Sequence, residues 1–135
     1  MALITWNEEY LVNVLEIDQQ HKKIVEIINR LYEGMQDGES KNVLHKILGD
    51  VVQYAAYHLG FEEKMLIEFS YPDATIHQQV HTDLIDQLKA LIEKYETGSA
   101  ALSPELTDFL KNWFVNHIMS NHKKYWDFLK SKGVS

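Results

Sequence analysis

The chain has 135 residues, of which 45% are hydrophobic and 24% charged, so it is long enough to bury the core of one domain. Its formal net charge of −7 argues against nucleic acid and anionic membranes as partners. The absence of cysteine excludes disulfides, iron–sulfur clusters and thiolate zinc sites. Residues 1–10 lack the basic start and apolar run of a signal peptide, and no segment is apolar enough to span a bilayer. We therefore expect a cytoplasmic, monomeric protein with one domain over residues 1–135.

Residues 1–17 are expected to form an extended N-terminal arm. We expect this arm to pack across the rest of the protein as a lid rather than to be a mobile terminus, because it is rich in apolar residues. These residues are Trp6, Tyr10, Leu11, Val12, Val14 and Leu15.

Two helices are expected next, over residues 18–37 and 41–69, with a turn at residues 37–40 between them. Asp18 and Ser40 are the predicted N-caps, and the second helix should end before Pro72, because proline disfavours helix in the residue before it. Apolar positions recur at alternating steps of four and three, which is typical of a core-facing stripe. The stripes are Ile17, His21, Ile24, Ile28, Leu31 and Met35, then Leu44, Leu48, Val51, Ala55, His58, Glu62 and Met65.

Two more helices are expected, over residues 74–96 and 104–130. Asp73 is the predicted cap of the third helix, residues 97–100 should end it, and Ser103-Pro104 is a strong start signal for the fourth. The short connections between the four helices predict an all-α fold, an antiparallel up-down-up-down four-helix bundle. The stripes are His77, His81, Leu84, Leu88, Leu91 and Tyr95, then two neighbouring rows, Leu106, Leu110, Trp113 and His117, and Phe114, Ile118, His122, Tyr125 and Leu129.

Metal-capable side chains occupy stripe positions where leucine or isoleucine is expected. Burying such groups is unfavourable unless something inside the bundle binds them. Imidazole nitrogen with carboxylate oxygen suits iron, manganese or zinc better than calcium or magnesium. The number of ligands is too large for one metal but suits two metals bridged by Glu62. The candidate ligands are His21, His58, Glu62, His77, His81 and His117.

The combination of these positions is more informative than any one of them. A single histidine on an apolar face is more often a hydrogen-bonded core residue than a ligand, and a lone His-x-x-x-His pair is weak evidence. Here, however, all histidines but one lie on or beside a stripe, and only His45 is expected at the surface. In an antiparallel bundle, His21 would lie level with His58, and His77 and His81 level with His117. We therefore expect the ligands to meet at one end of the bundle.

Together these residues resemble the hemerythrin family, in particular its single-domain bacterial branch, over nearly the whole chain. The motifs that carry the resemblance are Ile17-Asp18-x-Gln20-His21-Lys22, His58-x-x-x-Glu62-Glu63, His77-x-x-x-His81, and Trp113 followed by His117-Ile118.

The resemblance implies a non-haem di-iron site. His77, His81 and His117 would hold one iron, and His21 and His58 the other. Glu62 and a solvent-derived oxo or hydroxo group would bridge the two irons. Dioxygen would bind at the open position of the two-histidine iron and rest as a hydroperoxide in an apolar pocket. The candidates for the wall of this pocket are Trp113, Phe114 and Ile118.

The sequence departs from the family pattern at His122, where the family has a second bridging aspartate. Asn121 is not an acid, and Asp127 lies about 7.5 Å further along the helix. A carboxylate can span two metals about 3.5–4 Å apart, whereas the two nitrogens of an imidazole diverge. Three outcomes are open. His122 would bind the two-histidine iron terminally; or it would fill or crowd the open position and weaken reversible oxygen binding; or the second metal would bind poorly. The alternative is that His122 turns away and forms a hydrogen bond nearby.

Three functions are compatible with this pattern. The leading hypothesis is a dioxygen-binding protein for oxygen transport, storage or delivery, whose partners would be a redox protein or an oxygen-consuming enzyme. The second is a di-iron peroxidase or oxidase in which His122 acts as acid or base beside bound peroxide. The third is an oxygen, redox or iron sensor, which is less favoured because no output domain is evident.

Overall fold

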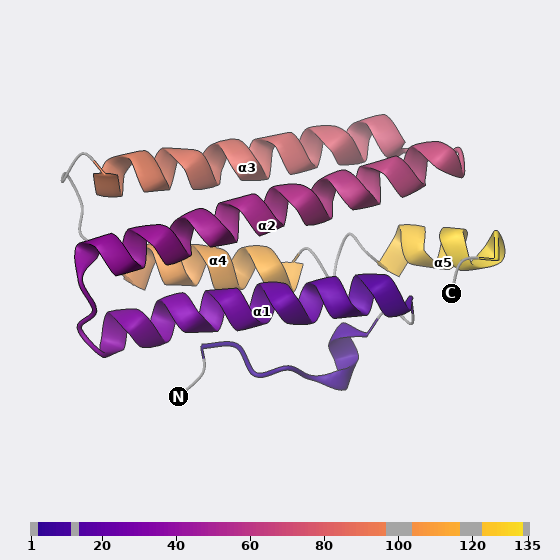
Figure 1. Ribbon diagram of the computed structural model, residues 1–135. Coiled ribbons are helices and arrows are strands. Elements are labelled where there is room, and N and C mark those ends of the chain that lie inside the picture. Colours follow the sequence, from indigo (N-terminus) through magenta and orange to yellow (C-terminus); the bar gives the residue numbers. More distant parts are fainter. Residues whose placement is uncertain (1–2, 12–13, 97–103, 117–122, 134–135) are drawn as a thin grey trace.

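The computed structural model describes residues 3–11, 14–96, 104–116 and 123–133. They form a short 3-10 helix, Glu8–Tyr10, and the helices α1 (Leu15–Gln36), α2 (Lys41–Glu68), α3 (Ala74–Glu96), α4 (Pro104–Asn116) and α5 (Lys123–Ser131). Helix α1 packs against α2 and α4, and α2 packs against α3. Successive helices from α1 to α4 run in opposite directions (Figure 1). The predicted all-α, up-down-up-down four-helix bundle is therefore confirmed.

Some predicted positions lie outside the described residues, so their roles stay predictions. The helix expected over residues 104–130 corresponds to α4 and α5, and the segment between these two helices is one such stretch. The predicted positions that lie outside the description are Val12, the turn at 97–100, Ser103, His117, Ile118 and His122, together with the side chains of Tyr95 and Tyr125.

Helix α1 begins earlier than predicted, at Leu15, and the prediction that Asp18 caps it is wrong. The N-cap residue is Val14, and the Asp18 N–H already donates an intrahelical bond to the Val14 carbonyl at 2.9 Å. The physical reason is burial, because Val14 and Ile17 are 3% and 0% exposed and the helix has to start before Asp18 to place both inside. The carboxylates of Glu16 and Asp18 instead lie in the first turn, where their negative charges interact favourably with the positive end of the helix dipole. The N-terminal arm accordingly ends at Val14.

The ends of α2 follow the predicted signals. The Ser40 side chain accepts a hydrogen bond from the Val43 N–H at 3.3 Å, as expected of an N-cap. At the other end, the N–H groups of Ser70 and Tyr71 donate to the carbonyls of Ile67 and Leu66 at 3.1 and 2.9 Å. This is a Schellman motif, and it places Ser70 in a left-handed conformation with φ of 58°. The tight ending turns the chain back so that α3, which begins at Ala74, runs alongside α2.

The buried interior consists of two apolar clusters with a polar layer between them. The larger cluster fills most of the bundle, and the smaller one lies where α1 begins, α2 ends and α5 packs. On α1, His21 falls between Ile17 of the small cluster and Ile24 of the large one. On α2, His58 and Glu62 precede Leu66 of the small cluster. The polar groups thus lie near one end of the bundle, closed off from that end by the smaller apolar cluster.

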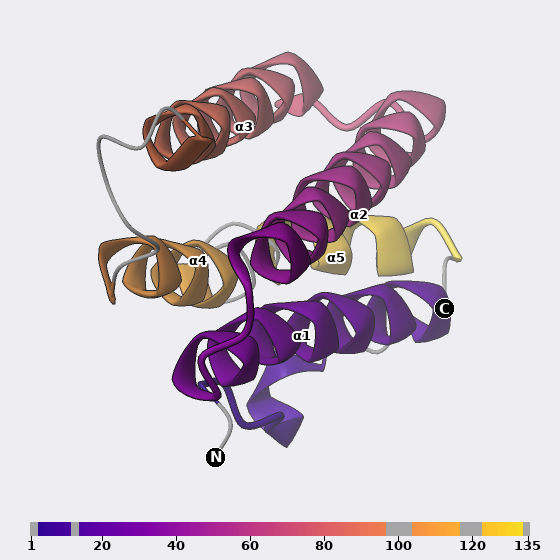
Figure 2. The same cartoon turned by 60° about the vertical axis from the view of Figure 1, so that its left-hand side comes forward.

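The Asn29 side chain of α1 forms hydrogen bonds with the backbone of the N-terminal arm. Asn29 receives a hydrogen bond from the Ile4 N–H at 2.9 Å and donates one to the Ile4 carbonyl at 2.8 Å. Ile4 itself is 3% exposed and belongs to the large apolar cluster. The arm lies on the side of α1 away from α3 (Figures 1 and 2). The arm is therefore docked on the bundle by hydrogen bonds between its backbone and the Asn29 side chain, as well as by apolar contact.

Replacing Asn29 with alanine is expected to release the arm and lower stability by about 1–3 kcal/mol, because two partly buried backbone groups lose their partner. Asn29→Asp keeps the oxygen acceptor but loses the N–H donor, so its effect should be smaller. Chemical denaturation and hydrogen exchange of the Ile4 amide measure both effects. Asn42→Ala, at an exposed position of α2, is the matched control. Equal exchange of the Ile4 amide in Asn29→Ala and wild type would contradict this docking role.

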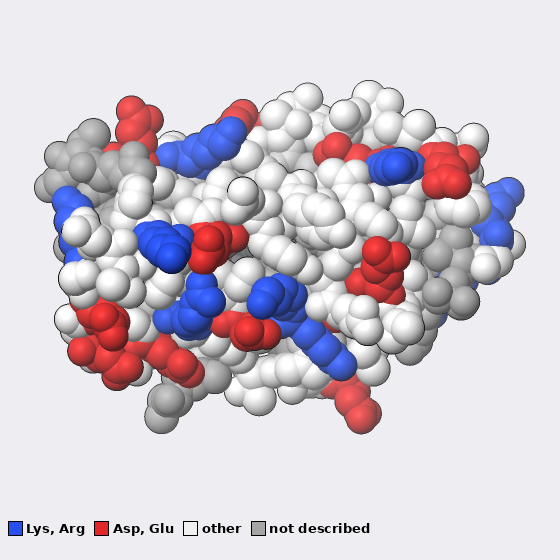
Figure 3. Space-filling view, viewed as in Figure 1, with Lys and Arg blue, Asp and Glu red and all other residues white. Residues whose placement is uncertain are grey.

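The face shown in Figure 3 carries both acidic and basic side chains, with a group of acidic side chains near the turn between α1 and α2. One exposed pair, Arg30 and Asp50 at 2.8 Å, links α1 to α2. Among the described residues, no helix is both long and apolar enough to cross a membrane.

Candidate metal centre

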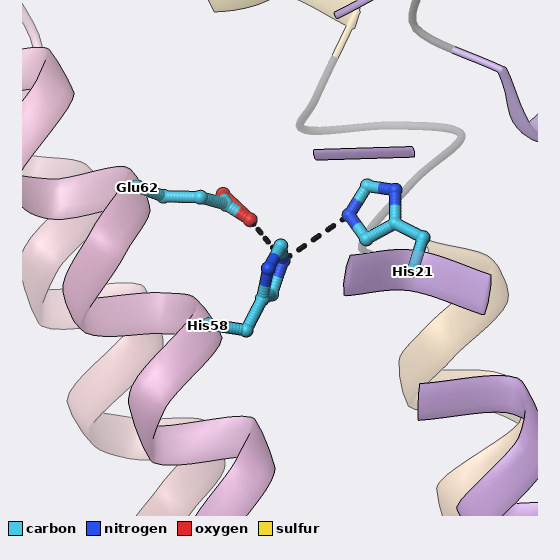
Figure 4. Close-up of side chains that lie close together, drawn as sticks. All are labelled: His21, His58 and Glu62. Carbon is cyan, nitrogen blue, oxygen red and sulfur yellow. Dashed lines mark hydrogen bonds and ion pairs between the residues drawn. The ribbon is translucent and has the colours of Figure 1, made fainter. Parts of the chain in front are cut away.

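Three predicted ligands meet between α1 and α2. His21 Nε2 lies 3.1 Å from His58 Nε2, and the same His58 nitrogen contacts Glu62 Oε1. Figure 4 shows the three side chains directed into the space between the two helices, with His58 in the middle. All three side chains are fully buried. His58 and Glu62 share this direction because residues four apart lie on one face of a helix.

A second group is formed by Glu62 with His77 and His81 of α3. One donor atom from each of these residues lies within 4.8 Å of the other two, and the same holds for His21, His58 and Glu62. The His77 and His81 rings lie one helical turn apart, with centroids 4.6 Å apart. His81 is 1% exposed and His77 is 9% exposed. Glu62 therefore belongs to both groups and lies between two pairs of histidines.

Hydrogen bonds to the outer ring nitrogens orient two of these histidines. His58 Nδ1 lies 2.7 Å from Gln20 Oε1, and His81 Nδ1 lies 3.2 Å from Glu63 Oε1. Amide and carboxylate oxygens only accept hydrogen bonds, so each Nδ1 must donate its N–H. Each Nε2 then carries the lone pair that a metal needs, and in His58 it is this atom that faces His21 and Glu62.

These outer partners were not predicted as functional residues. Gln20 and Glu63 occur in the sequence motifs, each next to a candidate ligand, but their positions in the chain do not show what they contact. Gln20 is 4% exposed, whereas the Glu63 side chain is 24% exposed. Burial raises the pKa of Glu63 above its ordinary value, and the neighbouring negative charge of Glu62 raises it further.

Apolar and aromatic side chains cover the His21 side of the site. Phe114, predicted as a pocket wall, is fully buried with its ring perpendicular to that of His21 at a centroid distance of 6.1 Å. Tyr10 of the arm packs on the edge of Phe114 at 5.7 Å, and Trp6 packs on Tyr10 at 5.6 Å. Trp113, also predicted for the wall, is 7% exposed within the large apolar cluster. The arm thus covers the aromatic wall of the site, as expected of a lid.

The structure brings together five of the predicted ligands, and the other two lie outside its description. His117 and His122 fall in the segment 117–122, as does Ile118, so their places at the site stay predictions. His45, expected at the surface, is exposed.

The donor set fits two transition-metal ions. It combines four imidazoles and one carboxylate, all at or near full burial, in two overlapping groups. Lone-pair atoms that converge in a buried space repel one another unless a proton or a metal cation lies between them. Nitrogen and oxygen donors without thiolate suit iron, manganese or zinc, and a shared carboxylate is the usual bridge between two such ions.

Comparisons with known proteins agree with this geometry. Residues 13–128 match the family model described as the hemerythrin HHE cation binding domain. A bacteriohemerythrin of Stenotrophomonas maltophilia is 30% identical over 131 residues, covering 97% of this chain and 84% of the relative. A bacteriohemerythrin of Methylococcus capsulatus is 32% identical over 126 residues, covering 93% of this chain and 95% of the relative. The crystal structure of a wild-type hemerythrin superposes with a TM-score of 0.86 at 30% identity, covering 93% of this chain and 97% of the other.

Proposed function

The chain belongs to the hemerythrin family, a family of di-iron oxygen-binding proteins, and we propose that it is itself a di-iron protein that binds dioxygen. The observation that carries the proposal is the position of Glu62, which completes one ligand group with His21 and His58 and another with His77 and His81. We further propose that residues 1–135 form one such domain.

In this proposal each side chain has a defined task. His77, His81 and His117 would hold one iron, His21 and His58 would hold the other, and Glu62 would be the ligand shared by both. When bound, the iron pair would supply the electrons that dioxygen binding requires. Gln20 and Glu63 keep the Nε2 atoms of His58 and His81 available by accepting their Nδ1 protons.

The aromatic wall serves to keep water from the bound ligand. Phe114 lies against His21 with no exposed surface, and Tyr10 of the arm covers Phe114 from outside. A dry, apolar pocket suppresses proton entry and the loss of bound oxygen as a reduced product. The docked arm therefore contributes to the reversibility of binding in this proposal.

His122 is proposed to weaken that reversibility. It stands where the family has a second bridging carboxylate, and an imidazole cannot join two metals through divergent nitrogens. With one carboxylate instead of two, this ligand set would hold its second metal less firmly. We propose that the protein passes oxygen to, or receives electrons from, a separate redox protein or oxygen-consuming enzyme.

Restoring the carboxylate tests both the function and the role of His122. Ferrous protein exposed to air should contain two irons and develop a charge-transfer absorption band that disappears on removal of oxygen. In His122→Asp the oxygenated form should persist about 10–100 times longer, the range typical for changes that reorient metal ligands. His45→Asp makes the same chemical change at an exposed position and should behave as wild type. Protein without iron, or with a single tightly held zinc, would contradict the proposed function.

A further inference from the structure

We propose that Glu63 is a positioning residue for His81: its carboxylate fixes the ring orientation and tautomer of His81 and strengthens the metal bond at that histidine. The proposal rests on the metal centre described above. It concerns a residue that is not a ligand in the proposed di-iron site.

The first observation is that two adjacent carboxylates of α2, Glu62 and Glu63, contact different groups. Successive residues of a helix differ in direction by about 100°. Glu62 is fully buried between the two histidine pairs, while Glu63 points toward α3 and contacts the far side of the His81 ring. The ring of His81 therefore faces Glu62 with one edge and Glu63 with the other. Rotation of this ring would break the Glu63 contact and turn Nε2 away from the shared carboxylate.

The second support is a contrast with the other histidine pair. The outer partner of His58 is the neutral amide of Gln20 at 2.7 Å, in a fully buried position. The outer partner of His81 is a carboxylate at 3.2 Å. A carboxylate draws the Nδ1 proton more strongly than an amide does and makes Nε2 a better electron donor to a metal. The Nε2 atoms of His58 and His81 therefore differ in their strength as electron donors, because different groups accept the Nδ1 protons of the two rings.

The third support is the access of solvent to this contact. A surface groove of about 260 Å³ between α2 and α3 has Glu63 and His81 in its wall, next to the small residues Ala56 and Gly60. The Glu63 side chain is 24% exposed, so solvent can reach its carboxylate. The contact of Glu63 with His81 Nδ1 is thus only partly buried, whereas the contact of Gln20 with His58 Nδ1 is buried.

The test uses zinc, which is diamagnetic and needs no oxygen chemistry. Zinc-loaded protein with ¹⁵N-labelled histidine is compared in wild type, Glu63→Ala, Glu63→Gln and Glu68→Gln by NMR of the ring nitrogens. Glu68→Gln removes the same charge from an exposed position of the same helix and is the matched control. Zinc release to a chelator is followed on the same samples. Alanine and glutamine both favour helix, so α2 is expected to fold in every variant, which circular dichroism checks.

Wild type and Glu68→Gln should show His81 protonated at Nδ1 and bound through Nε2. Glu63→Ala should lose this single tautomer and release zinc from the His81 position about 10–100 times faster. Glu63→Gln should keep the tautomer, because an amide oxygen still accepts the proton, and should release zinc at an intermediate rate. Unchanged tautomer and unchanged release in Glu63→Ala would overturn the proposal. Failure of the iron protein to bind oxygen would count against the proposed function but would leave these zinc results unaffected.

Discussion

Replacing Glu62 with glutamine is expected to abolish the two-metal site. Glu62 is the one described residue that belongs to both ligand groups. An amide has one oxygen and no charge, so it cannot bridge two cations as a carboxylate does. We expect metal content to fall from two ions per chain to at most one, and the affinity for the second ion to fall by more than about 100-fold, the upper range for changes in outer ligand partners. Elemental analysis and isothermal titration with ferrous iron under anaerobic conditions measure both quantities.

The adjacent Glu63→Gln variant is the matched control for Glu62→Gln. It makes the same chemical change one residue away, and Glu63 contacts the ring of His81 rather than the metal position. Glu63→Gln should keep two ions with a weaker hold on one, whereas Glu62→Gln should lose the pair. Two tightly bound ions in Glu62→Gln would contradict the assignment of Glu62 as the bridge. Circular dichroism of both metal-free variants separates loss of metal from loss of fold.

Removal of metal is expected to lower the melting temperature by roughly 10–20 °C. A ligand that binds only the native state stabilises it by about 4 kcal/mol when present at 1,000 times its Kd. For a domain of this size, each kcal/mol shifts the melting temperature by a few degrees. The loss should be large because His21, His58, Glu62 and His81 are all at most 1% exposed. In the metal-free protein these polar groups remain in the apolar interior, with only one another and neighbouring side chains for compensation.

Differential scanning calorimetry before and after anaerobic chelation measures this difference. Adding back ferrous iron should restore the original melting temperature, and magnesium should not, because it prefers oxygen ligands. The same experiment on Glu62→Gln should show a much smaller difference between the metal-free and the loaded protein. An unchanged melting temperature after complete removal of metal would show that the buried histidines are stabilised by one another rather than by ions.

The two predictions separate the first ligands from the residues that orient them. In the proposed centre, Glu62 would decide whether two ions are held, whereas Gln20 and Glu63 would orient individual histidines. Consecutive ring contacts from Trp6 through Tyr10 to Phe114 connect the docked arm to the wall beside His21. In the proposed function, residues of the arm therefore contribute as well as residues of the helices.

The sequence by itself determined which residues share a helix face. Alternating steps of four and three placed His58 with Glu62 and His77 with His81, and the Ser40 cap located the start of α2. The predicted starts of the next two helices agree with Ala74 and Pro104. These properties depend on local geometry, because side chains three or four residues apart always lie close together on a helix. The fold class followed from the number of such stripes and the short connections between them.

Only the tertiary structure decided what lies opposite each face. The start of α1 depended on burying Val14 and Ile17 against other parts of the chain, which overrode the capping preference of Asp18. The contact of Glu63 with His81 depends on how α2 and α3 are rotated about their axes. The periodicity of a single helix carries no information on the rotation of its neighbour, because that rotation is set by the packing of both helices together. The outer partners of the metal centre could therefore be assigned only once the helices were seen side by side.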